Sequence, residues 1–172
     1  NRRPLNLNGV IDVKGATTFN VTANGTLRLN NNAGYLSGSG DIIKDGLGSL
    51  HSRANQAEWK GNLIIKQGAV YAASQADVLG TGYLTGKTIT LGDNERQGSA
   101  ELLINNAENV NGWVYEVNHD INVVYNPAQT KRLGSENIMN GDMVSYNGDI
   151  TLNDSLILLI RDTGLSVGGE QS

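Results

Sequence analysis

The segment GSGDIIKDGLGSLHSRANQAEWKGNLIIKQGAVYAASQADVLG, residues 38–80, decides the fold. Glycine recurs along it every few residues, and short apolar pairs such as Leu63 and Ile65 lie between the glycines. Glycine adopts left-handed backbone angles without strain and allows close backbone approach, so it marks places where a chain turns. The segment therefore predicts short extended elements that are separated by sharp corners.

The rest of the chain follows a period of two. Apolar residues stand one residue apart, as strands with one buried face require. The pairs are Phe19/Val21, Leu27/Leu29, Leu63/Ile65, Ile89/Leu91, Leu102/Ile104, Tyr115/Val117, Ile121/Val123, Ile150/Leu152 and Leu156/Leu158. Asn-Gly dipeptides at residues 8–9, 24–25, 111–112, 140–141 and 147–148 separate many of these pairs and indicate further changes of direction.

Asn-Gly between alternating apolar segments is also the usual signal of an antiparallel β-hairpin. Two features favour a different arrangement: the strands are shorter than those of a β-sandwich, and segment 86–93 is echoed by segment 148–154. We therefore predict an all-β fold, a right-handed parallel β-helix (β-solenoid), with about 20 to 25 residues per coil and roughly seven or eight coils. We expect no stable helix: the best candidate is residues 72–79, AASQADVL, which allow only two turns before Gly80.

Composition narrows the classes of function. The chain has 172 residues, with 22 Gly, no Cys and a net charge of −4. No cluster of Lys and Arg exceeds the pairs Arg2-Arg3 and Lys131-Arg132, so the basic surface that nucleic-acid binding needs is missing. The absence of Cys excludes disulfides, thiolate catalysis and Cys-ligated zinc. No apolar stretch approaches the roughly 18 to 20 residues of a membrane-spanning helix.

The order of motifs in residues 38–80 is specific. The motif residues are Gly38, Gly40, Lys44, Gly46, Gly48, Leu50, Asn55, Trp59, Gly61, Gly68, Val70, Leu79 and Gly80. With this order the segment resembles the passenger-associated transport repeat, also called the autotransporter-associated β-strand repeat, of large exported bacterial surface proteins. Two departures are a longer spacing from Asn55 to Trp59 and Asn62 in place of the customary second glycine.

Residues 83–110 also resemble the extended version of this repeat. The resemblance implies that residues 1–172 form a single β-solenoid segment of a larger protein. Residues 36–80 are the best match to the repeat, residues 81–164 the extended part of the unit, and residues 165–172 the start of a further unit. It also implies a secreted or bacterial cell-surface location, although it says little about what the protein binds.

Few residues suggest chemistry. The histidines are His51 and His119, and no Ser or acid stands beside either in a triad-like pattern, so we expect His51 to lie on the surface and His119 in a turn. The acid pairs Asp41/Asp45 and Asp93/Glu95 would suit a polysaccharide hydrolase or lyase, but acids at glycine-rich corners more often stabilise turns. Oxygen ligands for calcium are offered by Asp93, Asn94, Glu95, Asn153 and Asp154, without any known calcium-loop spacing.

Aromatic residues could line a glycan-binding face if several pointed outward in one row. The candidates are Trp59, Trp113, Tyr35, Tyr83, Tyr115, Tyr125 and Tyr146. We expect some of them to fill the core and others to lie singly on the surface. Lys44, the lysine of the repeat, is interpreted as a corner residue whose stem covers apolar surface.

These observations favour a non-enzymatic structural or stalk module of a secreted, autotransporter-like protein that supports surface display, adhesion or assembly. The alternative is a polysaccharide-binding or polysaccharide-cleaving β-helix. We expect no catalytic, cofactor-binding or metal-binding residue. The expected partners are adjacent repeats of the same protein or an end-to-end homo-oligomer, with surface glycans as a further possibility and no nucleic acid or membrane span.

Overall fold

The computed structural model describes residues 4–29, 36–53, 58–72, 79, 86–105, 114–138 and 141–161. Within these ranges the chain consists of strands and connecting turns, without a helix. The strands are β1 (Leu5–Leu7), β2 (Ile11–Val13), β3 (Thr17–Asn20), β4 (Thr26–Leu29), β5 (Leu36–Gly38), β6 (Ile42–Asp45), β7 (Ser49–Ser52), β8 (Leu63–Ile65), β9 (Gly68–Ala72), β10 (Thr88–Leu91), β11 (Gly98–Asn105), β12 (Val114–Val117), β13 (Asp120–Val123), β14 (Gln129–Glu136), β15 (Met143–Tyr146), β16 (Ile150–Leu152) and β17 (Ile157–Arg161).

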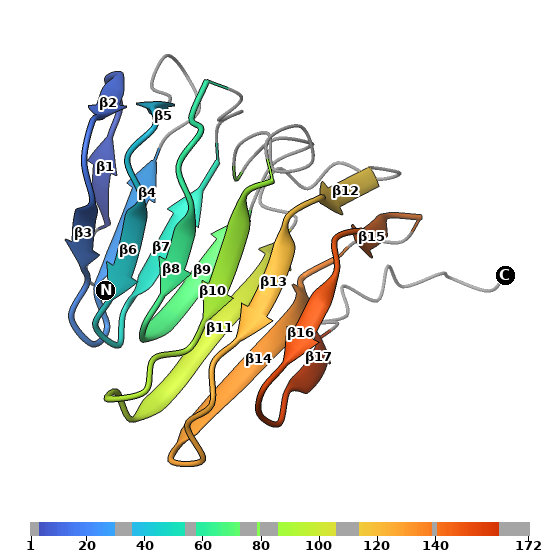
Figure 1. The fold of residues 1–172 in the computed structure, drawn as a ribbon. Coiled ribbons are helices and arrows are strands. Elements are labelled where there is room, and N and C mark those ends of the chain that lie inside the picture. Colours follow the sequence, from blue (N-terminus) through green and yellow to red (C-terminus); the bar gives the residue numbers. More distant parts are fainter. Residues whose placement is uncertain are drawn as a thin grey trace, which may run out of the picture.

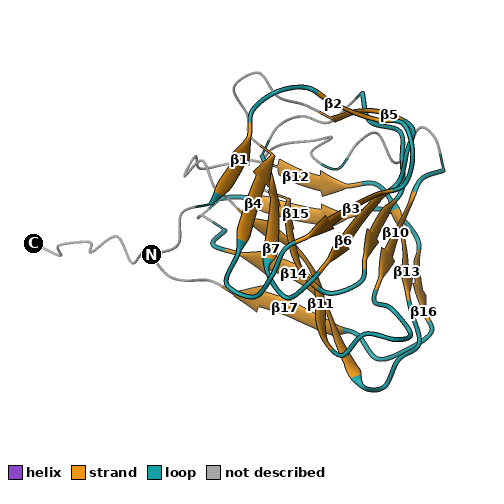
Figure 2. Cartoon of the chain, turned by 90° about the vertical axis from the view of Figure 1, so that its left-hand side faces the viewer, coloured by secondary structure: helices purple, strands orange, loops and turns teal. Residues whose placement is uncertain are grey.

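Two long parallel sheets dominate the structure. The seven-stranded sheet has the order β1-β4-β7-β9-β11-β14-β17, and the six-stranded sheet has the order β16-β13-β10-β8-β6-β3. Two-stranded sheets, β2-β5 and β12-β15, lie between them along the chain. Figure 1 shows the six-stranded sheet in front of the seven-stranded sheet, and Figure 2 looks along the stack, where strands of successive levels overlie one another.

Every strand pair that the structure describes is parallel, and each strand pairs with one from another level of the chain. For example, β1 pairs with β4, and β3 pairs with β6. The hairpin interpretation of the Asn-Gly dipeptides is therefore wrong for the described strands. The all-β architecture and the strand order are consistent with a β-solenoid, although among the described residues no sheet closes on itself. The candidate helix at residues 72–79 lies mostly outside the described residues.

Inward-facing aliphatic side chains form columns that run along the stack. One column on the seven-stranded sheet follows the register Leu5, Leu27, Leu50, Val70, Leu102, Leu133 and Leu158. A second, on the six-stranded sheet, contains Ile42, Leu63, Ile89 and Ile121, all of them buried. Burying one such side chain stabilises the fold by about 1.5–3 kcal/mol, so the columns are the principal source of stability.

Coil length varies more than the sequence predicts. The register advances by 20 residues from Leu50 to Val70 but by 32 residues from Val70 to Leu102. The longest coils carry residues 73–78, 80–85 and 106–113 in their connections, and these lie outside the described residues. The register of the sheets therefore tolerates insertions, because extra residues are placed between strands and leave the inward columns intact.

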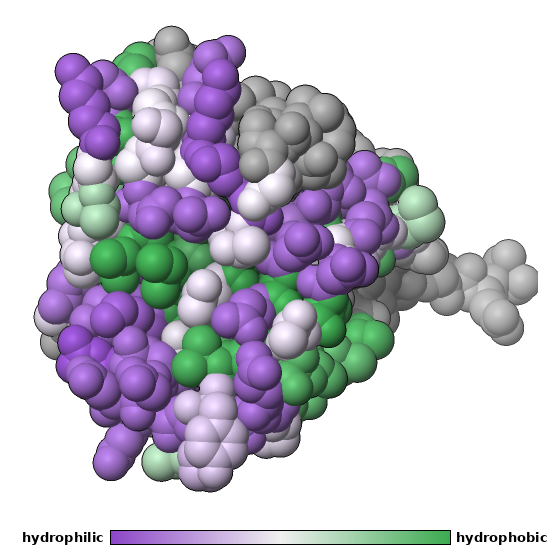
Figure 3. All heavy atoms as spheres, viewed as in Figure 1, coloured by the Kyte–Doolittle hydropathy of each residue, from purple (hydrophilic) through white to green (hydrophobic). Residues whose placement is uncertain are grey.

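The outer faces differ from the inner ones. Outward positions on the six-stranded sheet follow the register Thr18, Ile43, Ile64, Thr90, Asn122 and Thr151. Figure 3 shows this side of the molecule largely hydrophilic, with hydrophobic residues in a band across it.

The part of the chain that the structure describes contains no helix of the length and apolarity needed to cross a bilayer.

Backbones of successive coils approach closely at the corner between β2 or β5 and the six-stranded sheet. A Cβ atom added at Gly40 would collide with the backbone of Gly15 in the previous coil, whereas one added at Gly15 would meet nothing. These two glycines occupy neighbouring levels of the same corner, so they form a matched pair for substitution.

We expect Gly40→Ala to lower the free energy of unfolding by about 1–3 kcal/mol, because the coils must separate to admit the methyl group. Gly15→Ala should change it by less than about 0.5 kcal/mol. Chemical denaturation of the two variants and the unsubstituted protein measures both values. Equal stability of the two variants would contradict the stacking at this corner.

Candidate functional site

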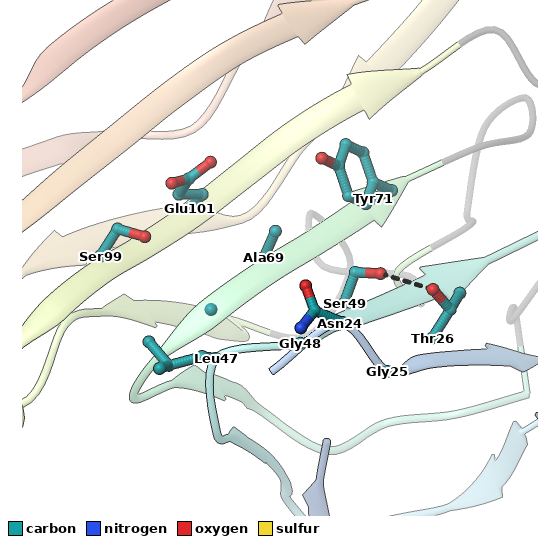
Figure 4. Close-up of a pocket in the computed structure, with 11 residues that line it drawn as sticks. Asn24, Gly25, Thr26, Leu47, Gly48, Ser49, Ala69, Tyr71, Ser99 and Glu101 are labelled. Carbon is teal, nitrogen blue, oxygen red and sulfur yellow. Dashed lines mark hydrogen bonds between the residues drawn. The ribbon is translucent and has the colours of Figure 1, made fainter. Parts of the chain in front are cut away.

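A shallow groove crosses the outer face of the seven-stranded sheet. It has a volume of about 310 Å³ and spans strands β4, β7, β9 and β11 (Figure 4). Thr26, Ser49 and Ala69 stand in register on three adjacent strands and form its floor. Glu101 continues this row on β11, and Leu47 forms part of the rim at the corner. The surface is concave here because Thr26, Ser49 and Ala69 have small side chains, whereas the neighbouring outward residues have large ones.

A second outward row runs beside the floor. Arg28, His51 and Tyr71 stand in register on β4, β7 and β9, each two residues further along its strand than the floor residue. The rings of His51 and Tyr71 contact each other with centroids 4.6 Å apart. The Ser49 hydroxyl lies 3.2 Å from Nε2 of His51 and donates a hydrogen bond to Oγ1 of Thr26 at 3.3 Å. The groove therefore presents hydroxyl groups beside an aromatic wall.

The two rings beside the groove are held in their neutral forms. Burial lowers the pKa of His51 to about 4, with further lowering from the cations Arg28 and Arg53. Burial raises the pKa of Tyr71 to about 12, and a hydrogen bond to Glu136 adds to the effect. Near neutral pH the imidazole and the phenol are therefore both uncharged.

The sequence analysis expected no triad-like pattern around either histidine, and it did not identify Ser49, which lies beside His51 on the same strand face. Nucleophilic catalysis would also require a group that orients the imidazole, usually a carboxylate. Among the described residues no carboxylate hydrogen-bonds to His51, and the charges that lower its pKa are those of Arg28 and Arg53. The Ser49–His51 pair is therefore better suited to binding than to attack.

Two buried lysines close the corner that leads from the six-stranded to the seven-stranded sheet. Lys44 is fully buried, and its Nζ donates to the carbonyl oxygens of Asp45, Gly46 and Gln67 at 2.7–3.0 Å. Burial lowers the pKa of Lys44 to about 8, an effect that the neighbouring Asp45 opposes. Lys44 does lie at a corner, as expected, but the sequence analysis did not predict that its ammonium group lies inside and binds the backbone of two coils.

Lys131 repeats this arrangement further along the stack. Its Nζ donates to the carbonyl oxygens of Asn126 and Gln129 at 2.6 and 3.0 Å, and to Oδ2 of Asp154 at 2.6 Å. Hydrogen bonds from Lys131 and from the backbone N–H groups of Asn126 and Ser155 hold the pKa of Asp154 at about 2. Asp154 is thus occupied as the counter-ion of a buried lysine.

Polar contacts also join different coils at this corner. Arg96 and Asp45 form an ion pair of 2.6 Å, and Lys66 and Asp93 one of 3.1 Å. Oδ1 of Asp93 additionally accepts hydrogen bonds from the backbone N–H groups of Glu95 and Arg96. The corner acids therefore neutralise cations and stabilise turns.

Two candidate acids remain. Asp41 accepts hydrogen bonds from the backbone N–H and side-chain amide of Asn62, and Glu95 is exposed. Among the described residues no three His, Cys, Asp or Glu side chains lie close enough together to hold a metal ion. The calcium candidates Asn94 and Asn153 are exposed, and Asn153 donates to Asn122 and to the carbonyl oxygen of Val123. The two acid pairs and the calcium candidates are thus not brought into one site.

The other singled-out residues are dispersed. His119 is buried, and the carbonyl of Leu79 accepts a hydrogen bond from it, while burial lowers its pKa to about 4. Trp59 is buried and donates from Nε1 to the carbonyl oxygen of Gly40 at 2.9 Å. Tyr115 is buried, Tyr146 donates to the carbonyl oxygen of Gly134 at 2.7 Å, and Tyr125 is exposed. Trp113, Tyr35 and Tyr83 lie outside the described residues.

Sequence reasoning missed Ser49 and Tyr71, which line the groove, and Arg28, which stands in the row beside it. A signal was available, because Arg28 and Tyr71 each stand between two inward apolar residues of a strand. Aligning these strands as coils would have placed both residues and His51 in one outward row. The groove itself was not predictable, since it depends on register across four levels.

No family model, no curated protein and no solved structure matches this chain.

The titration of His51 tests the charge arrangement beside the groove. We expect its pKa to be about 4 in the unsubstituted protein and to rise in Arg28→Gln, because one of the two cations that disfavour the imidazolium is removed. A pH titration followed by proton NMR measures this. His119, whose pKa is lowered by burial without an arginine among the causes, is the internal control. An unperturbed pKa near 6.5 for His51 would contradict the geometry.

The pairing of Asp154 with Lys131 predicts a dependence of stability on pH. The pKa of Asp154 is about 2 in the folded protein, below its ordinary value of 3.8. The ionised carboxylate therefore stabilises the fold above about pH 4, and this contribution is lost as the pH falls from 3.8 to about 2. Asp154→Asn should remove that part of the acid-induced loss, measured by denaturation at pH 2 and pH 6.

The control for Asp154→Asn is Asp12→Asn, which removes an exposed ion pair with Lys14. This variant should keep its stability at pH 6 within about 0.5 kcal/mol of the unsubstituted protein. If Asp154→Asn shows the same loss between pH 6 and pH 2 as the unsubstituted protein, the ion pair does not contribute.

Proposed function

We propose that this chain is a non-enzymatic structural module, a segment of a right-handed parallel β-helix whose coils continue beyond its two ends. The single observation that carries the proposal is the exposure of inward-column residues on the last coil. Leu158 and Ile160 continue the buried columns of Leu102/Leu133 and Ile104, yet they are 74% and 87% exposed. These side chains stand where the next coil would cover them.

The first coil also leaves a residue of this inward column exposed. Leu5 heads the same column and is 64% exposed. Strands β1 and β17 are also the edges of the seven-stranded sheet, so each offers unpaired backbone groups on one side. Such edges pair readily with a further strand. The partner is either an adjacent repeat of the same protein or the first coil of a second copy.

The charges at the corners support a structural role. The acids Asp45, Asp93 and Asp154 are engaged by arginine or lysine, and their ion pairs connect different coils. Carboxylates held in ion pairs between coils stabilise the stacking of the coils. They are poorly placed to act as general acids or bases. The right hand of the helix is proposed because parallel crossover connections are right-handed in most proteins.

A secreted or bacterial cell-surface location belongs to the same proposal. It rests on the resemblance of residues 36–80 to the passenger-associated transport repeat. A module of this kind would act as a stalk, spacer or assembly element that holds other parts of a surface protein away from the cell. Such a scaffold could also bind polysaccharide. The ligand would bind to the outer faces of the sheets, whereas further coils would pack against the two ends.

The end faces give the test. The unsubstituted chain should associate end to end as its concentration rises, which sedimentation velocity and small-angle scattering would record as longer particles. The double variant Leu158→Lys, Ile160→Lys should remain monomeric, because covering two ammonium groups with an apolar coil is costly. Circular dichroism should show the same strand-rich spectrum for both.

The matched control is Tyr125→Lys, which replaces an exposed side chain on a lateral corner. This variant should associate as the unsubstituted protein does. A monodisperse monomer at all concentrations of the unsubstituted chain, or association that survives the double substitution, would count against continuation of the coils. A substantially helical spectrum would end the proposal.

A further inference from the structure

The outer face of the seven-stranded sheet carries an imbalance of charge beside the groove. On the later strands, each outward arginine has a carboxylate partner on the neighbouring strand: Arg132 pairs with Glu101 at 2.5 Å, and Arg161 with Glu136 at 3.3 Å. On the earlier strands Arg28 and Arg53 form no ion pair with any described residue. Within the part of the chain that the structure describes, no carboxylate therefore neutralises these two cations.

The two arginines also have unused hydrogen-bonding capacity. Nε of Arg28 and Nε of Arg53 are both shielded from solvent without a hydrogen-bond partner. A buried donor without a partner is costly, so each such group needs an explanation, and an ion or water that binds there is one. Both guanidinium groups lie close enough to His51 to lower its pKa, so the two cations share one neighbourhood.

The groove adjoins this neighbourhood directly. Its floor residues Thr26 and Ser49 stand two residues before Arg28 and His51 on the same outward faces of β4 and β7, a separation of about 7 Å. The site thus combines hydroxyl groups, the edge of the Tyr71 ring and two guanidinium groups. Hydroxyl donors and acceptors with an aromatic side chain suit a sugar ring, and paired guanidinium groups suit its acidic substituent.

We propose that the groove and the flanking arginines Arg28 and Arg53 form a binding site for an acidic polysaccharide, with sugar units on the Thr26–Ser49 floor and a carboxylate or sulfate on the guanidinium groups. The proposal goes beyond the structural role, since it uses the side of the stack and not its ends. Because the groove crosses strands, successive sugar units would lie across several coils.

Nucleic acid is the less favoured polyanion. The whole chain has a net charge of −4, and the outward cations on the later strands are already neutralised by Glu101 and Glu136. A long phosphate backbone needs an extended positive surface, whereas a sugar acid needs one or two cations beside a place for its ring. The observed pair of arginines beside a small groove fits the second requirement.

The test compares three oligosaccharides of equal length: a hexamer of galacturonic acid, a heparin-derived hexasaccharide and neutral maltohexaose. Calorimetry at low salt should show binding of at least one acidic hexamer that is about tenfold or more tighter than that of maltohexaose. Binding should weaken as salt is added. Preference between the first two hexamers shows whether carboxylate or sulfate is the group recognised.

Variants locate the site. Arg28→Gln and Arg53→Gln should each weaken binding about tenfold, and Ser49→Trp, which fills the floor, should abolish it. Arg161→Gln removes a paired arginine from the same sheet face and should change affinity less than about twofold. NMR shift changes in the unsubstituted protein should centre on Ser49, His51 and Tyr71, a readout that does not depend on any variant folding correctly.

Three outcomes would overturn the proposal. The first is the absence of binding of either acidic hexamer to the folded, unsubstituted protein at low salt. The second is equal loss of affinity in Arg161→Gln and Arg28→Gln, which would indicate general charge attraction. The third is tighter binding of double-stranded DNA than of both acidic hexamers. None of these outcomes affects the end-to-end association, so failure here is distinguishable from failure of the structural proposal.

Discussion

The vertical registration of inward-facing side chains from one coil to the next is the constraint on which the rest of the structure depends. A parallel pair fixes which residues stack, and a shift by one residue would turn the apolar side chains of a strand outward. The column from Leu27 through Leu50 and Val70 to Leu102 keeps its alignment although the intervening segments differ in length. Corners and connections can therefore vary as long as each strand returns to the same register.

Much of this arrangement could be predicted from the residues. The alternation of Ile89 with Leu91 and of Ile121 with Val123 gave the strands and their buried faces, and both pairs do stack on each other. The preference for stacked coils over hairpins came from strand length and from the echo between segments 86–93 and 148–154, which hold strands β10 and β16 of one sheet. These signals are local, so a single sequence contains them.

The remainder depends on contacts between distant residues. The sequence alone does not predict that the ammonium groups of Lys44 and Lys131 are buried. Their burial depends on a corner that supplies three oxygen atoms to each of them. The row of Arg28, His51 and Tyr71 likewise requires the register of three strands that are 20 to 23 residues apart. Coil length could not be inferred, because insertions in connections do not alter the periodic pattern.

The steps in register have a consequence for how the chain folds. Each strand finds its partner within 20 to 32 residues along the sequence, at every level of the stack. The loop that must close to add a level therefore remains of similar size however many levels are already in place. Growth of the folded part can proceed in one direction along a chain that is presented gradually, and lengthening the polypeptide need not slow the addition of each new level.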